Sequence, residues 1–302
     1  MPKADDGELL LLDVPQTERV KTFKRIENPI WTNNKAKLIE RYLYYFAWVT
    51  HHGTYIDGFA GPQRIENQDM WSARLVLANR PRLLRHFFLF DIDAIKVALL
   101  NQLKLDQPPL TKKEKRSIEV YQGDFNSNIR EVLKAHPIKG KEATFCLLDQ
   151  RTFECDWSTV EFIAQHKPAG HNKIEIFYFL ANSWIHRAAS KKNKPAMRRW
   201  FGNDGWEAFL ALKSVARTVA FTERFTKELG YKFAYSFPIY GHDSNGGVRT
   251  MYSMIHASDH PKAPVLMHRA YQRAETVKED KDQLELISRQ AEKMKPCSDG
   301  AS

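Results

Sequence analysis

Cysteine is scarce in this chain of 302 residues, which contains only Cys146, Cys155 and Cys297. An odd number of cysteines cannot pair completely, and none of the three has CxxC spacing. The sequence therefore predicts neither a disulfide framework nor a cysteine-based zinc site, and it favours a reducing, cytoplasmic compartment. We expect Cys146 and Cys155 to be small buried apolar residues rather than nucleophiles.

Long apolar runs and phosphate-binding motifs are missing as well. No stretch approaches the roughly 18–20 apolar residues that span a bilayer, and the first residues, MPKADDGELLLLDVP, are acidic where a signal peptide is basic. We therefore expect neither membrane insertion nor secretion. The patterns GxGxxG and GxxxxGK(S/T) do not occur, so a phosphate cradle of the dinucleotide or P-loop type is not predicted.

A metal site is not predicted either. His256, Asp259 and His260 are close in the sequence, but no second ligand set accompanies them and no helix fixes their spacing. We interpret this segment as a loop at the end of a strand.

The charge balance is strongly basic. The chain has 46 Lys and Arg against 36 Asp and Glu, a formal net charge of +10, and 43% of its residues are hydrophobic. This apolar content predicts a folded core, and the basic excess favours a polyanionic partner such as nucleic acid or an anionic membrane surface. The candidate nucleic-acid contacts are the cations of two basic runs, namely Lys112, Lys113, Lys115 and Arg116, then Arg187, Lys191, Lys192, Arg198 and Arg199.

Aromatic residues accompany the second basic run, at Trp184, Trp200, Phe201 and Trp206. Two interpretations are open. The rings could stack on splayed bases of a nucleic acid, or they could form the core of an amphipathic insert whose basic face is solvated.

Helical and strand-like segments alternate along the first two thirds of the chain. Apolar residues at helical spacing predict a helix over 31–51, and helices are also expected at 94–105, from 126 and from 157. The strand-like runs are 53–57, 85–93, 117–124, 143–149 and 173–181. Parallel neighbours need long crossovers, so this alternation predicts an α/β fold: a doubly wound, Rossmann-like sheet with helices on both faces.

The last third of the chain has a different pattern. Helical periodicity without strands predicts a helical insert over about 185–230, and two β-rich runs at 231–240 and 249–257 predict an antiparallel pair that closes the mostly parallel sheet. We therefore expect an N-terminal extension over 1–25, one main domain over 26–272 and a charged tail over 273–302.

Acidic residues end the first four predicted strands: Asp57, then Asp91 or Asp93, then Asp124, then Asp149. Ligands of open α/β sheets bind outside the carboxyl ends of the strands. The glycines of the turn 57–61 allow close backbone approach, and an acid after the second strand suits the two hydroxyls of a ribose. Without a pyrophosphate clamp, this pattern describes a nucleoside site that fits S-adenosylmethionine.

Three motifs carry a family resemblance. The runs YIDGFAGP at 55–62, FLFDID at 88–93 and GDFN at 123–126 resemble motifs one to three of class I S-adenosylmethionine-dependent methyltransferases. Over about 31–271 the chain more closely resembles the three-Cys-motif partner (TcmP) family, and it is more distantly similar to the J-type ribosomal RNA adenine methyltransferases. The features that carry this closer resemblance are Trp31, Lys35, Tyr42-Leu43, the turn 55–63, Trp200-Phe201-Gly202 and the run 255–261.

The resemblance implies roles for individual residues. Lys35, Asp57, Gly58, Phe59, Ala60 and Gly61 would contact the cofactor around its methionine end, Asp91 or Asp93 the ribose, and Asp124 with Phe125 the adenine. Asp149, Gln150 and Phe153 would lie beside the methyl acceptor, where Asp149 either orients the acceptor or caps a loop. The implied activity is methyl transfer from S-adenosylmethionine to a nucleic acid, with RNA favoured over DNA.

Two departures from the family pattern support a second hypothesis. Gln63 stands where the family has glycine, and the stretch 149–154 lacks the DPPY-type motif of the adenine methyltransferases. On this hypothesis the chain keeps the fold without its chemistry and acts as the binding partner of a three-Cys-motif protein of the radical type.

Overall fold

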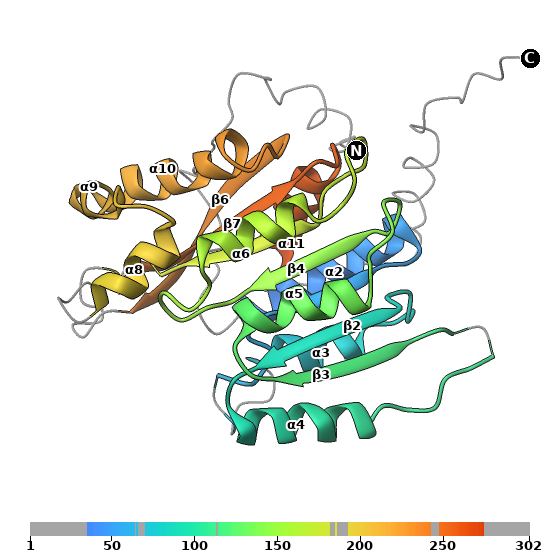
Figure 1. Cartoon of the computed structure of the whole chain (residues 1–302). Helices are drawn as coiled ribbons and strands as arrows, with labels where there is room; N and C mark the ends of the chain where they lie inside the picture. Colours follow the sequence, from blue (N-terminus) through green and yellow to red (C-terminus); the bar gives the residue numbers. More distant parts are fainter. Residues whose placement is uncertain are drawn as a thin grey trace, which may run out of the picture.

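A computed structural model describes residues 35–63, 65, 70–112, 114–181, 185, 193–242 and 248–274. They form a seven-stranded sheet with the order β3-β2-β1-β4-β5-β7-β6, in which β7 runs antiparallel to the other six strands (Figure 1). The strands are β1 (Thr54–Asp57), β2 (His86–Asp91), β3 (Ser117–Gln122), β4 (Thr144–Leu148), β5 (Glu175–Leu180), β6 (Phe233–His242) and β7 (Val248–Ser258). The predicted α/β class and the antiparallel closing pair are confirmed.

Helices cover both faces of the sheet. One face carries α2 (Lys35–Thr50), α3 (Ser72–Ala78), α4 (Ala94–Leu105) and α11 (Ala263–Arg273). The other carries α5 (Phe125–Ala135), α6 (Trp157–Gln165), α8 (Lys194–Phe201), α9 (Trp206–Ala211) and α10 (Ser214–Lys227). The crossovers change face between β3 and β4, so the strand order reverses between β1 and β4, where ligands of open α/β sheets bind.

Two apolar cores form because successive strand residues point to opposite faces. In β4, Phe145 and Leu147 belong to the core beneath α2, whereas Cys146 and Leu148 belong to the core beneath α6. Strand β5 is buried at every position, which explains why its sequence is continuously apolar after Glu175. Cys146 and Cys155 are both buried, as expected, and burial raises the pKa of each thiol.

Aspartates begin two of the helices that leave the strand ends. The carboxylate of Asp93 accepts hydrogen bonds from the backbone N–H groups of Ile95 and Lys96, and Asp124 accepts one from Ser127. These caps satisfy donors that the first turn of a helix leaves without partners. Two of the predicted strand-end acids are therefore also helix caps.

The helical insert is present as α8, α9 and α10, and Figure 1 places α8 beside the carboxyl ends of the parallel strands. The predicted N-terminal extension and nearly all of the charged tail lie outside the described residues. In the described part of the chain, no helix combines the length and the apolar character that crossing a membrane requires.

Candidate active site

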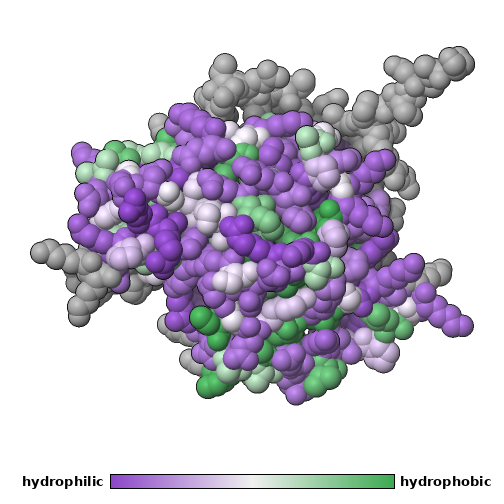
Figure 2. Space-filling model, in the orientation of Figure 1, coloured by the Kyte–Doolittle hydropathy of each residue, from purple (hydrophilic) through white to green (hydrophobic). Residues whose placement is uncertain are grey.

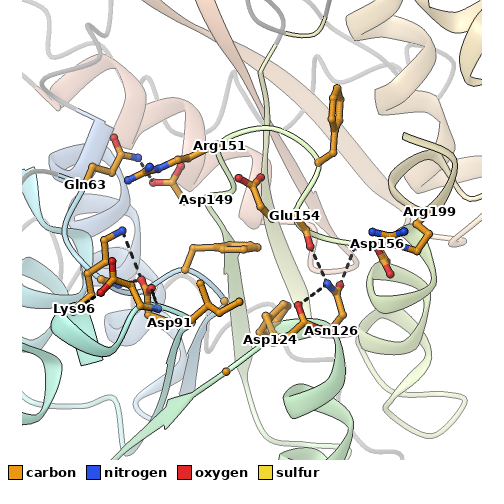
Figure 3. A pocket seen from close by; sticks show the side chains of 18 residues that line it. Gln63, Asp91, Lys96, Asp124, Asn126, Asp149, Arg151, Glu154, Asp156 and Arg199 are labelled. Atoms are coloured by element: carbon orange, nitrogen blue, oxygen red, sulfur yellow. Dashed lines mark hydrogen bonds and ion pairs between the residues drawn. The ribbon is translucent and has the colours of Figure 1, made fainter. Parts of the chain in front are cut away.

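A cleft with a volume of ≈590 Å3 lies at the carboxyl ends of β1 to β4, at the point where the strand order reverses. Figure 3 shows its polar side chains in three groups, around Asp91, around Asp149 and around Asn126. The lining residues are Gly58, Phe59, Gly61, Gln63, Asp91, Ile92, Asp93, Lys96, Gly123, Asp124, Phe125, Asn126, Asp149, Arg151, Phe153, Glu154, Asp156 and Arg199. Six carboxylates face three basic side chains, so the cleft is acidic although the chain is basic.

Asp91 holds the first group together. Its Oδ2 accepts a hydrogen bond from the backbone N–H of Gly61 at 3.0 Å, and its Oδ1 accepts one from that of Asp93 at 3.0 Å. A Cβ at Gly61 would lie 2.4 Å from Asp91 Oδ2, so only glycine allows the turn after β1 to approach this carboxylate. Lys96 Nζ lies 3.9 Å from Oδ2, so Oδ1 has the more accessible lone pair for a ligand hydroxyl. Asp93, engaged as a helix cap, is the less suitable ribose partner.

Asp57 lies behind the cleft rather than in its lining. It is 1% exposed and accepts hydrogen bonds from the Tyr55 hydroxyl at 2.7 Å and the backbone N–H of Phe59 at 3.2 Å. Burial raises the pKa of Asp57 to about 7, against the two hydrogen bonds, which lower it. Ala60 is buried in the same turn and donates its N–H to Phe90. Both residues shape the turn that the resemblance assigns to the cofactor.

Apolar side chains form one wall of the cleft. Phe125 is buried against Phe59 and Phe90, and a Cβ at Gly58 would come within 3.0 Å of the Phe125 ring. Ile92 is 71% exposed and lies between Asp91, which ends β2, and Asp93. An exposed isoleucine beside a buried carboxylate is suited to a flat apolar group that carries hydroxyls.

The sequence matches no protein-family model and no curated protein. The site is therefore interpreted from its own geometry and chemistry.

Asp149 is held by two side chains from distant segments. Its Oδ1 lies 2.6 Å from Lys35 Nζ, and its Oδ2 accepts a hydrogen bond from Gln63 Nε2 at 3.2 Å (Figure 3 shows the second contact). These contacts take the place of the loop cap that we considered. Lys35 is buried, with its ammonium 4.6 Å from the centre of the Phe179 ring and 5.1 Å from that of Tyr252. Lys35 therefore contacts Asp149 and is not among the residues that line the cleft.

The other two candidate acceptor residues are separated by the structure. Phe153 lines the cleft and packs on Trp200 at 5.1 Å between ring centres. Gln150 is 1% exposed and its Oε1 accepts a hydrogen bond from the backbone N–H of Cys155. Gln150 therefore shapes the loop after β4 from behind the cleft.

Sequence reasoning missed the residues that tie this loop to α5. Asn126 Nδ2 donates to Asp124 and to the carbonyl of Glu154 at 2.7 Å, while Asn126 Oδ1 accepts from the backbone N–H of Asp156. Figure 3 shows Asn126 between Asp124 and Asp156, with Arg199 beside Asp156. The GDFN motif contained Asn126, but no pattern in the sequence linked it to residues 28–30 positions later.

The two basic runs have different positions. Lys112 and Lys115 are exposed in the loop before β3, at the edge of the sheet opposite the cleft, and Arg116 turns inward to the carbonyl of Leu77. Arg198 and Arg199 end α8, and Arg199 lines the cleft. The remaining candidates, Lys113, Arg187, Lys191 and Lys192, lie outside the described residues.

The aromatic residues of the insert belong to its core. Trp200, Phe201 and Trp206 are 1%, 9% and 8% exposed, so the interpretation of these rings as stacking faces for bases is wrong. Trp200 and Phe201 pack on Phe221 of α10, and burial of this apolar surface stabilises the insert. Trp184 lies outside the described residues.

His256 lies inside β7, within the β-rich run predicted at 249–257. Its Nε2 contacts Glu175 at 2.9 Å, and the same carboxylate accepts hydrogen bonds from Tyr42 and Ser258. Asp259 and His260 follow the strand, as expected. Among the described residues, no group of three or more His, Cys, Asp or Glu side chains could hold a metal ion.

Proposed function

We propose that the chain binds S-adenosylmethionine in the cleft and transfers its methyl group to a nucleic acid, with RNA favoured over DNA. The observation that carries the proposal is Asp91: a nearly buried carboxylate at the end of β2 that faces the cleft beside the exposed side chain of Ile92. This combination suits a ribose diol next to an apolar base, and it lies at the switch point of the sheet.

The chemistry of the lining supports the same ligand. S-adenosylmethionine has a positively charged sulfonium and an ammonium group, which suit a cleft with six carboxylates. When bound, its sulfonium supplies a methyl group that a nucleophile can accept. Gly61 allows the turn after β1 to pack against Asp91, Asp91 would hold the ribose, and Ile92 with Phe125 would flank the adenine. The protein's task is then to hold and orient the two reactants.

Calorimetric titration with S-adenosylmethionine tests the proposal. We expect wild-type protein to bind and Asp91→Asn to bind roughly 10- to 100-fold more weakly, because a charged hydrogen-bond acceptor contributes about 1.5–3 kcal/mol. Asp106→Asn, an exposed aspartate at the other end of α4, is the matched control and should bind like wild type. Absence of binding to wild-type protein at millimolar ligand would refute the proposal.

One observation favours the second hypothesis, in which the fold serves a three-Cys-motif protein without methyl transfer. Both oxygens of Asp149 are engaged, by Lys35 and Gln63, at the position where the family resemblance implies an acceptor-orienting group. Incubation with labelled S-adenosylmethionine and total RNA or DNA separates the two. Label transfer that Asp91→Asn abolishes supports the enzyme; cofactor binding without transfer supports the binding partner.

A further inference from the structure

A second hollow, the α8–α9 groove, adjoins the cleft on the helical insert. It has a volume of ≈660 Å3 and shares Arg199 with the cleft, so the two form adjacent parts of one surface. Its lining residues are Lys194, Pro195, Arg198, Arg199, Asp204, Trp206 and Glu207. Figure 2 shows that the surface over α8 is mainly hydrophilic, whereas apolar side chains gather along the lower edge, over α4.

The cations of the groove are accessible to a ligand. Lys194, Arg198 and Arg199 have side chains that are 55%, 66% and 61% exposed. Arg198 pairs with Asp204 at 3.0 Å and Lys194 with Glu207 at 3.2 Å, and both carboxylates are more than 60% exposed. Exposed ion pairs of this kind contribute at most about 1 kcal/mol, so a phosphate can replace or join them.

The cleft and the groove have opposite charge preferences. The carboxylates of the cleft repel phosphates, whereas the groove presents three cations against the two exposed carboxylates of Asp204 and Glu207. Two of these cations are guanidinium groups suited to bidentate contacts with phosphate oxygens. Among the described residues, a polynucleotide that places one nucleoside near the cleft therefore has a favourable path for its backbone over the basic side. Arg199 stands at the boundary between the two hollows.

We propose that the α8–α9 groove binds the phosphodiester backbone of a single-stranded nucleic acid and thereby presents one nucleoside to the cleft. The inference rests on the proposed function in assigning a nucleoside to the cleft. Binding of phosphates in the groove does not depend on that function. Trp206, the aromatic residue in the lining, is only 8% exposed, so the groove offers phosphate contacts and little base stacking. Recognition by the groove is thus independent of base sequence and sensitive to salt.

Fluorescence polarisation with a labelled single-stranded oligoribonucleotide, and with the DNA of the same sequence, tests the proposal. The double variant Lys194→Ala/Arg198→Ala removes two cations that line the groove but not the cleft. The control Lys139→Ala/Lys141→Ala removes the same charge from two exposed lysines in the loop before β4. We expect at least tenfold weaker binding for the groove variant and a salt slope reduced by about 1.4, at ~0.7 for each lost phosphate contact.

Asp204→Asn is a second, gain-of-function test. It frees Arg198 from its carboxylate partner, so we expect tighter binding of the oligonucleotide. A purely structural ion pair would give lower stability with unchanged binding.

Each outcome decides for or against the groove. If wild-type protein does not bind the oligonucleotide, or if the groove and control variants weaken binding equally, the proposal is overturned, whether or not S-adenosylmethionine binds. Loss of oligonucleotide binding in the groove variant supports it, even if titration shows no S-adenosylmethionine binding and the proposed function fails. Tighter binding of the DNA oligonucleotide would support the groove as a backbone-binding site and would favour DNA over RNA as the substrate.

Discussion

The buried carboxyl group of Asp57 makes the fold itself sensitive to pH. Its pKa in the native state, about 7, exceeds the ordinary value of 3.8, so between these values the native state holds a proton that the unfolded state has lost. The contribution of Asp57 to the free energy of unfolding therefore falls as pH rises from about 4 to about 7, by up to about 4 kcal/mol, and stays constant at higher pH.

Asp57→Asn removes this titration. We expect chemical denaturation to show a smaller loss of stability across that pH range in the variant than in wild-type protein. The difference between the two proteins isolates Asp57 from the histidines, some of which also titrate there. Identical pH slopes would mean that the carboxyl group is hydrated and ionised in the folded protein.

The ion pair of Lys35 with Asp149 illustrates what residue patterns cannot predict. Both residues were candidates for the site, but nothing in the sequence indicated that a side chain at the start of α2 would neutralise one after β4, 114 positions later. The side chains are only 5% and 10% exposed, so each charge depends on the other. Removing one partner leaves a buried charge uncompensated, which costs about 3–5 kcal/mol.

We therefore expect Lys35→Met and Asp149→Asn to destabilise the protein strongly, and the double variant to be clearly more stable than the sum of the single changes predicts. Urea denaturation of the four proteins measures this coupling. The exposed pair Lys194–Glu207 provides the control cycle and should give at most about 1 kcal/mol. Equal coupling in the two cycles would show that Lys35 and Asp149 are hydrated.

At the scale of elements, local signals predicted most of the fold. The helix over 94–105 has the predicted bounds, because the cap of Asp93 and a continuous apolar face both lie within it. Helices α3 and α11 were not predicted: α3 has only seven residues, and α11 follows a strand-end segment that was interpreted as a loop. The sequence could not show whether the aromatic residues of the insert are buried, because their burial depends on contacts with Phe221 of α10.

Arg224 connects the elements of the insert to the body of the fold. Its guanidinium lies 3.7 Å from the centre of the Trp157 ring on α6 and 4.3 Å from that of Phe201 on α8, and it forms a bidentate ion pair with Glu228. Only a planar guanidinium makes both kinds of contact.

Arg224→Lys keeps the charge but loses the stacking and the bidentate pair. We expect a loss of about 2 kcal/mol in unfolding free energy, measured by denaturant titration. Lys227→Ala, in an exposed pair with Glu223 on the same helix, should change stability by less than about 0.5 kcal/mol. If Arg224→Lys leaves the free energy of unfolding unchanged, apolar packing alone holds the insert in place.

At the scale of the whole molecule, the chain has a net charge of +10, but its cleft is lined by more carboxylates than basic side chains. On the proposed function, this local field distinguishes the cofactor from its demethylated product, because S-adenosylmethionine has a sulfonium charge and S-adenosylhomocysteine has a neutral thioether. One carboxylate at ~4 Å favours the extra positive charge by about 1 kcal/mol in a water-like dielectric. This corresponds to roughly fivefold tighter binding.

Calorimetric titration of both ligands at low and high salt measures that preference. We expect S-adenosylmethionine to bind about fivefold more tightly at low salt, and the ratio to shrink as salt screens the carboxylates. Glu154→Gln removes one carboxylate from the cleft lining and should reduce the ratio, whereas Asp106→Asn should leave it unchanged. A product that binds as tightly as the cofactor, with the same salt dependence, would show that contacts with the adenosyl group outweigh the field of the cleft.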